Sequence, residues 1–190
     1  MEAEYQKFTA ALHKLGHFTQ DQISLLLKRI QIQKVSKGEH LLEPGQICSG
    51  IFFVQEGSLT HYNLYDGGET VINLWVEGDW VLEHQSFTLQ APSLNTITAF
   101  QNSTLLLITL DDLHKLIAMS PAFFQMGRLL DNDKHLFWND PRTSPEERYL
   151  TLMKQRPEVL RTFPLKYIAS YLGMVPETLS RVRRTIKDGD

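Results

Sequence analysis

Apolar residues recur at helical spacing near the start of the chain. Between residues 7 and 30 they return every three or four positions, and a break over residues 16–19 divides the pattern in two. This spacing predicts two short helices that each bury one face. Asp21 follows the break where a helix cap would serve. The apolar positions are Phe8, Leu12, Leu15, Ile23, Leu26, Leu27 and Ile30.

The pattern changes between Ile32 and Leu110, where glycines separate short β-prone segments. Regular spacing of this kind is typical of a compact antiparallel β-barrel or roll. Asp66, Gly67 and Gly68 form a hairpin signal between two of these segments. The clearest predicted strands are 51–54, 59–65, 71–76, 95–99 and 104–109.

Helical patterns return after the roll. Asp111 and Asp112 are expected to cap a short helix, and Ser120 and Pro121 to begin a longer one with a broad apolar face. We expect this face both to pack on the roll and to form a seam between two copies of the chain. Residues 139–145 predict a hinge, and residues 145–155 a further helix. The apolar face consists of Phe123, Phe124, Met126, Leu129, Leu130, Leu136 and Phe137.

The segment 163–184 predicts two short helices joined by a tight turn. Leu165, Ile168, Ala169 and Leu172 recur at helical spacing, and Gly173 follows where a left-handed residue would end the first helix. A second helix is expected to begin at Val175 and Pro176. Its inner face would hold Leu179, Val182 and Ile186, and its outer face Glu177, Thr178, Arg181 and Arg184. Such a division favours a helix-turn-helix that reads DNA.

An amphipathic helix pair with a solvated basic face is the plainer interpretation of this segment. Charge favours DNA binding, since residues 142–190 hold ten Lys or Arg against six Asp or Glu, a net charge of +4. The first 141 residues hold nine against sixteen, a net charge of −7. We therefore expect a basic C-terminal module on an acidic body.

Composition limits the other classes of function. The chain has 190 residues, of which 42% are hydrophobic, and it shows neither a signal-peptide core nor an apolar run that could span a bilayer, so we expect a cytoplasmic protein without a membrane partner. Its single cysteine, Cys48, allows no intrachain disulfide, and its seven histidines show no metal-ligand spacing. His84 is interpreted as a surface or structural residue. No nucleotide-binding or hydrolase motif occurs, so we expect a protein that is not an enzyme and that binds no cofactor.

Taken together, these segments resemble the Crp/Fnr family of bacterial transcription regulators over nearly the whole chain. Residues 37–80 resemble the glycine-punctuated cyclic-nucleotide-binding roll of that family, and residues 176–184 its recognition helix. The resemblance implies an α+β fold with an N-terminal double-stranded β-helix or jelly-roll, a connecting dimerisation helix and a C-terminal winged-helix-like helix-turn-helix. The corresponding domains would be 1–117, 118–140 and 141–190.

The resemblance also implies roles for side chains of the second helix. Glu177 and Arg181 fall on positions that read bases, Pro176 on a third contact position and Thr178 on one that contacts phosphate. Arg183, Arg184 and Lys187 would contact or neutralise phosphates. The expected partner is a pseudo-palindromic double-stranded DNA site bound by a homodimer, with RNA polymerase as a further candidate partner. Typical members continue into a β-hairpin wing, whereas this sequence ends soon after Ile186, so we expect a wingless subgroup or a shortened chain.

The effector pocket is where the chain departs from the family. Members that bind cyclic AMP use a cassette in which an arginine holds the phosphate, and the corresponding stretch here is 78–99. Glu83 keeps the acidic residue for the ribose hydroxyl, but Ser93 stands in place of the arginine, and Leu94 and Asn95 in place of Ser-Ala. No Lys or Arg lies between Lys37 and Lys115 to replace it. We expect no tight cyclic AMP binding, and the natural small-molecule effector, if the chain has one, stays open.

Two alternatives remain at this point. The roll is also compatible with a cupin-like enzyme, which would need clustered metal ligands. The chain could instead be a sensor of a cyclic nucleotide or another small molecule that acts through protein contact, with its basic tail on an acidic partner.

Overall fold

The structure of the chain is a computed structural model that describes residues 5–65, 68–130 and 142–188. These residues divide into two compact units. The first unit contains the residues up to Leu59 together with those from Trp75 to the end of the second described range. The second unit contains segment 60–74 and the described C-terminal residues. Each unit is described by itself.

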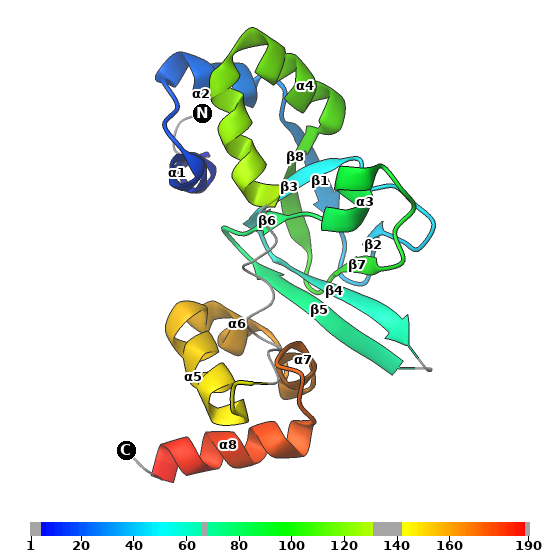
Figure 1. Cartoon of the computed structure of the whole chain (residues 1–190), viewed down its shortest axis with the longest axis vertical. Coiled ribbons are helices and arrows are strands. Elements are labelled where there is room, and N and C mark those ends of the chain that lie inside the picture. Colours follow the sequence, from blue (N-terminus) through cyan, green and yellow to red (C-terminus); the bar gives the residue numbers. More distant parts are fainter. Residues whose placement is uncertain (1–4, 66–67, 131–141, 189–190) are drawn as a thin grey trace. The chain divides into compact units, whose positions relative to one another are not determined.

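The helices and strands follow one another along the chain as labelled in Figure 1. Up to residue 65 they are α1 (Gln6–Leu15), α2 (Gln20–Leu27), β1 (Gln31–Val35), β2 (His40–Leu42), β3 (Gly50–Glu56) and β4 (Ser58–Tyr65). From residue 68 to 130 they are β5 (Gly68–Val76), β6 (Trp80–Val81), α3 (His84–Leu89), β7 (Thr96–Ala99), β8 (Ser103–Thr109), α4 (Leu110–Met119) and the 3-10 helix η1 (Pro121–Leu130). The last four helices are α5 (Pro145–Gln155), α6 (Pro157–Thr162), α7 (Leu165–Tyr171) and α8 (Pro176–Asp188).

The strands form two four-stranded sheets with the orders β1-β8-β3-β6 and β2-β7-β4-β5. In the first sheet β3 is a central strand that pairs antiparallel with β8 on one side and with β6 on the other. Residues 50–54 of β3 are therefore all buried, which explains why this strand reads as a continuous apolar run. The predicted jelly-roll-like antiparallel fold with helices is confirmed.

The core of the first unit lies between these strands and the N-terminal helices. Phe8 of α1 places its ring 5.3 Å from that of Phe53 and 5.4 Å from that of Trp80, measured between ring centroids. Phe53 and Trp80 lie 5.2 Å apart. Edge-to-face and tilted ring contacts of this kind add about 0.5–1.5 kcal/mol each beyond area burial. The apolar face predicted for the first helix thus contributes an aromatic side chain to the roll.

Gly57 is required by the tight connection between β3 and β4. Its φ is +92°, and a Cβ built there would lie 2.6 Å from the carbonyl oxygen of Asn102 and 2.2 Å from Ser103 Oγ. Both the left-handed backbone and the close approach therefore exclude a larger residue. This is the structural basis of one of the regularly spaced glycines.

The two N-terminal helices occur as predicted, but the cap of the second is a different residue. Thr19 is the N-cap of α2: its hydroxyl accepts from the backbone N–H of Gln22, and the Gln22 side chain accepts from the Thr19 N–H. This capping box satisfies two backbone donors at once. Asp21 lies in the first turn, where its charge favours the helix dipole. The prediction that Asp21 caps the helix was wrong.

Other elements differ from the prediction in type or were missed. β1, β2, β6, α3 and α6 were not predicted; β2 and β6 span only three and two residues, and only one residue of β1 is buried. Pro121 begins a helix as expected, but η1 is a 3-10 helix that buries Phe123 and Met126 and leaves Phe124 exposed. The hairpin turn at 66–67 and the apolar positions Leu136 and Phe137 lie outside the described residues.

In the second unit, segment 60–74 contacts the C-terminal helices through polar groups. Arg156 donates from one guanidinium nitrogen to the Leu74 carbonyl (2.9 Å) and from another to the Tyr171 hydroxyl (3.1 Å). The backbone N–H of Val71 donates to Ser170 Oγ over 2.9 Å. Burial, with Glu69 and Tyr62 nearby, raises the pKa of Tyr167.

In the described part of the chain, no helix combines the length and apolar character that a membrane crossing requires.

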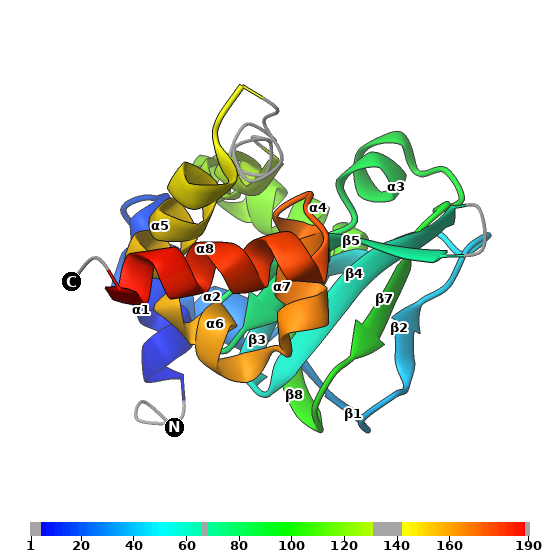
Figure 2. The ribbon, with the colours of Figure 1, turned by 90° about the horizontal axis from the view of Figure 1, so that it is seen from below.

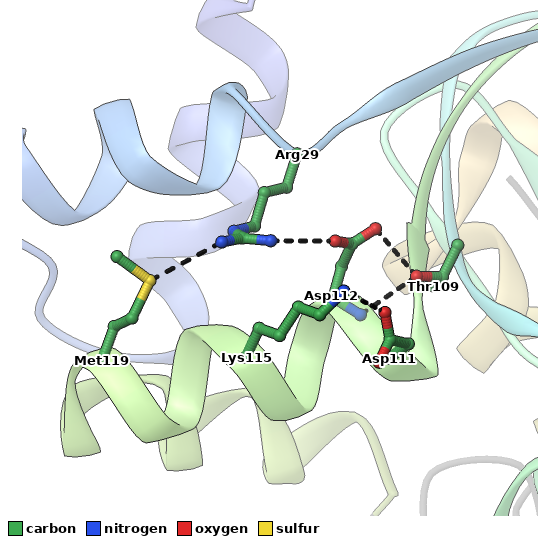
Figure 3. Close-up of polar contacts among 6 residues, drawn as sticks. All are labelled: Arg29, Thr109, Asp111, Asp112, Lys115 and Met119. Carbon is green, nitrogen blue, oxygen red and sulfur yellow. Dashed lines mark hydrogen bonds and ion pairs between the residues drawn. The ribbon is translucent and has the colours of Figure 1, made fainter.

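A polar cluster joins the end of α2 to the first turn of α4 (Figure 3). The prediction that Asp111 and Asp112 cap α4 was wrong, because the N-cap is Thr109, whose hydroxyl accepts from the backbone N–H of Asp112. The same hydroxyl donates to Asp112 Oδ2 over 2.8 Å, and Arg29 contacts Asp112 Oδ1 at 3.1 Å. The Thr109 hydrogen bond, aided by Arg29, holds the pKa of Asp112 below its ordinary value.

We expect Asp112→Asn to destabilise the chain by about 1 kcal/mol at pH 7, because the charge that Thr109, Arg29 and the helix N-terminus favour is lost. The folded-state pKa of Asp112 is lowered, so its contribution is complete above the unfolded value of about 3.9 and disappears as pH falls through the folded value. Urea unfolding at pH 7 and at pH 3 measures the difference, which should shrink at the lower pH. Asp111→Asn is the control, because the exposed Asp111–Lys115 pair contributes little. An undiminished effect at acid pH would contradict the assignment.

Candidate functional site

Glu83 occupies the start of α3 in the first unit and is only 4% exposed. It is the N-cap of that helix, and its Oε2 accepts from the backbone N–H of Ser86 at 2.5 Å. Its Oε1 accepts from Asn95 Nδ2 at 3.2 Å. Both carboxylate oxygens thus have protein donors, which makes Glu83 a structural cap; the role in binding a ribose hydroxyl stays a prediction.

Ser93 lies in the same polar network and is 2% exposed. Its hydroxyl donates to the Asn95 carbonyl (3.1 Å) and accepts from the Asn95 N–H (3.0 Å). Asn95 therefore connects Glu83 with Ser93. Leu94, in contrast, is 79% exposed, so the structure brings only two of the three predicted effector-pocket residues together.

Ser86 and Cys48 extend this network. The Ser86 hydroxyl accepts from the Cys48 N–H at 2.9 Å and donates to the Ala91 carbonyl at 2.5 Å. Burial raises the pKa of the Cys48 thiol, which donates to the Gly50 carbonyl. Cys48 is thus a buried core residue. Ser86 was missed because a serine on a short helix gives no signal of a buried partner.

The charged member of this network is a carboxylate. Glu83 is a buried carboxylate, and the sequence from residue 38 to residue 114 contains no Lys or Arg. An anionic phosphate placed beside Glu83 would meet a like charge, and this stretch holds no Lys or Arg to supply a cationic partner. The described residues hold no cluster of three or more His, Cys, Asp or Glu side chains that could bind a metal ion. The ring of His84 contacts the Leu130 carbonyl oxygen at 2.5 Å, in agreement with a structural role.

The second candidate region is the helical cluster α5 to α8, in which α8 runs past α7 and α5 (Figure 2). α5 begins at Pro145 as predicted, after a capping box between Ser144 and Glu147. The Ser144 N–H, which donates to the Glu147 carboxylate, lowers the pKa of Glu147. The cluster buries one apolar core, made of Tyr149, Leu152, Val159, Phe163, Ile168, Ala169, Tyr171, Leu172, Leu179 and Val182.

The turn between α7 and α8 depends on Gly173. Its φ is +64°, the left-handed conformation that the sequence predicts. The Gly173 N–H donates to the Ser170 carbonyl (3.0 Å) and the Met174 N–H to that of Ala169 (2.9 Å), the pair of bonds that defines a Schellman motif. The Leu172 carbonyl also accepts from Arg148 Nη1 of α5 at 2.6 Å, a cap that the sequence does not reveal. The end of α7 is therefore held by both backbone and side chain.

The two faces of α8 differ as predicted. Leu179 is fully buried and Val182 is 5% exposed, while Ile186 is half-buried. Glu177, Arg181, Arg183 and Arg184 are exposed, and Pro176 and Thr178 are half-buried. In the described part of the chain the guanidinium groups of these three arginines make no ion pair or hydrogen bond. The side chain of Lys187 lies outside the described residues.

Comparison with known proteins places this geometry. Residues 32–120, which include most of the roll, match the family model of the cyclic nucleotide-binding domain. No curated protein matches the sequence. FixK2 from Bradyrhizobium japonicum has a TM-score of 0.66 at 17% identity, over 84% of this chain and 85% of that one. The Thermus thermophilus catabolite activator protein has a TM-score of 0.54 at 18% identity, over 90% of this chain and 85% of that one. A CooA mutant from Carboxydothermus hydrogenoformans has a TM-score of 0.65 at 21% identity, over 85% of this chain and 78% of that one. At such identities the likeness shows the fold alone.

We expect Glu83→Ala to lower the free energy of unfolding by about 1–3 kcal/mol without any ligand, because the buried N–H of Ser86 and the half-buried amide of Asn95 lose their acceptor. Chemical unfolding followed by far-UV circular dichroism measures it. Glu56→Ala is the matched control, since Glu56 is exposed near the end of β3. Equal stability of both variants would argue against the capping role.

We expect Gly173→Ala to cost about 1–2 kcal/mol, because an L-residue with a Cβ is strained in the left-handed conformation. Gly127→Ala serves as its control: Gly127 has no such φ, and a Cβ there meets nothing within 4 Å. Thermal unfolding of both variants would decide, and a Gly173→Ala variant as stable as the control would contradict the backbone assignment.

Proposed function

We propose that the chain is a sequence-specific DNA-binding transcription regulator of the Crp/Fnr type, and that α8 is its recognition helix. The observation that carries this proposal is the two-sided character of α8. Leu179 and Val182 are buried in the helical cluster, while Arg181, Arg183 and Arg184 are exposed, and their guanidinium groups have no partner among the described residues. Guanidinium groups on the exposed side and flank of a helix suit phosphates and guanine edges. The similarity of the fold to FixK2 and to the catabolite activator protein supports it.

In this proposal two copies form a homodimer that presents two α8 helices to successive major-groove faces, with half-sites about 34–36 Å apart. Arg181 donates to a guanine, and Glu177 accepts from a cytosine amino group. Pro176 makes a further base contact, while Thr178, Arg183, Arg184 and Lys187 contact phosphates. The DNA-bound dimer would contact RNA polymerase. The protein would act in the cytoplasm.

The proposal includes a roll that does not respond to cyclic AMP through an arginine-dependent phosphate site. Support comes from the engagement of both Glu83 oxygens by Ser86 and Asn95, and from the absence of a cation in residues 38–114. A phosphate in this network would lose strong water contacts without a charge-assisted replacement.

One other function keeps a specific observation in its favour. The exposed arginines of α8 would also suit an acidic protein partner, in which case the chain would act by protein contact. The two functions differ in selectivity for base sequence.

A cupin-like enzyme would need stoichiometric metal, which elemental analysis of the purified protein would detect.

Selection of bound sites from random duplex DNA, with and without cyclic AMP, is the experiment that tests the proposal. We expect a two-fold symmetric site that is the same in both arms, and affinity that falls steeply with salt as counterions are released. If the selected DNA molecules shared no common sequence, the chain would not be a sequence-specific DNA-binding protein. A site found only with cyclic AMP would overturn the effector part alone.

We expect Arg181→Ala to weaken binding to the selected site by about 1–3 kcal/mol and to relax base preference at one position of each half-site. Arg161→Ala removes the same charge from an exposed position on α6 and should change neither. Electrophoretic mobility shifts on a panel of single-base variants measure both quantities. Equal weakening on every sequence would assign Arg181 to phosphate contact instead.

A further inference from the structure

A pocket of about 370 Å³ lies in the first unit among α3, α4 and η1. It is separate from the Glu83–Asn95–Ser93 network, none of whose residues line it. Its volume lies in the range of small-molecule sites, about 300–1,000 Å³. The apolar walls are formed by Phe87, Leu110, Leu113, Ile117, Phe123 and Phe124.

The chemistry of the lining selects against a charged ligand. Among the described residues no Lys, Arg, Asp or Glu side chain lines the pocket, and the polar groups are those of Thr88, Gln90 and His114. The Thr88 hydroxyl donates to the His84 carbonyl at 2.7 Å, and the Gln90 amide donates to the Phe87 carbonyl at 2.7 Å. The ring of His114 has no hydrogen-bond partner among the described residues. His114 therefore offers an uncommitted hydrogen-bonding group beside apolar walls.

Gln90 provides a second, independent observation at the pocket. With φ +49° and ψ +42° it is the only non-glycine residue with a positive φ in the described part of the chain. It ends α3, a position that glycine would fill without the cost of a left-handed Cβ. Strained residues of this kind concentrate where a side chain is needed at a site. The side chain of Gln90, which glycine would lack, lines this pocket.

Gly127 leaves one wall of the pocket open. A Cβ built on Gly127 meets no atom within 4 Å. Nearby, His84 at the start of α3 contacts the carbonyl of Leu130 at the end of η1, which ties two of the walls together. Phe124, at 66% exposed, presents an aromatic face that the folded unit does not cover. The hollow is thus bounded by α3, α4 and η1, and the side chains of the described residues leave it open beside Gly127.

We propose that this pocket binds a small, uncharged aromatic ligand that carries one hydrogen-bonding group. The aromatic body packs against the exposed ring of Phe124 and the half-buried side chains of Leu110 and Ile117, and the polar group meets the exposed ring of His114. The ligand would contact both α3 and η1, so it is a candidate effector of the regulator. Binding itself does not rest on the proposed DNA function.

The test uses N-phenyl-1-naphthylamine, an uncharged aromatic amine that fluoresces in apolar surroundings, added to the full chain. We expect saturable binding at one site per chain. Gly127→Leu fills the open wall and should weaken binding at least tenfold. Leu89→Phe is the matched control, because it adds apolar bulk on the exposed face of α3 outside the pocket, and it should bind as the parent does.

A second variant tests the polar end of the pocket. His114→Ala should weaken binding of the amine by roughly two- to tenfold, the effect of one hydrogen bond, and should leave binding of naphthalene unchanged. Circular dichroism confirms that each variant is folded. Cyclic AMP should not displace the amine.

Three results would overturn the proposal. The first is unchanged binding in the Gly127→Leu variant, and the second is displacement of the amine by cyclic AMP. The third is binding that increases on dilution while sedimentation shows a dimer dissociating, because a second copy would then cover the pocket. DNA-site selection is measured separately, so failure of this proposal leaves the proposed function standing.

Discussion

The burial of Leu179 and Val182 is the constraint on which the candidate DNA interface depends. These two side chains lie in the core of the helical cluster, so α8 has one rotational setting about its own axis. Arg181 and Arg184 are consequently directed to the other face, while Arg183 is exposed on the flank between the two faces. The left-handed turn at Gly173 and the cap from Arg148 hold the end of α7 in place, which positions the start of α8.

In the roll, the carboxylate of Glu83, for which the family resemblance predicts a ligand role, forms part of the scaffold. Glu83 caps α3 and binds Asn95, and Asn95 in turn binds Ser93. Buried carboxylates are costly unless their oxygens accept hydrogen bonds, and here both do. The oxygens of Glu83 thus have their hydrogen-bond donors within the protein, and these bonds stabilise the start of α3. The same helix forms one wall of the apolar pocket, so the cap and the pocket share one structural element.

Much of the fold could be predicted because strong local patterns coincide with tertiary demands. Residues 145–155 form a helix over the predicted range, and Gly173 has the predicted left-handed φ. Short elements could not be predicted, because a strand as brief as Trp80–Val81 exists only through its pairing with β3. The capping residues Thr19 and Thr109 were missed since nearby aspartates give an equally good signal, and only backbone geometry decides between them.

The sequence by itself determined the antiparallel roll with helices, the amphipathic division of α8 and the lack of any cation between Lys37 and Lys115, since each follows from residue type and spacing. Only the tertiary structure decided which polar groups meet. Glu83 and Asn95 are brought together by the fold over twelve positions, and Phe87 and Phe123 line one pocket although they belong to different helices. Contacts between distant residues depend on how elements pack, and no local pattern encodes that packing.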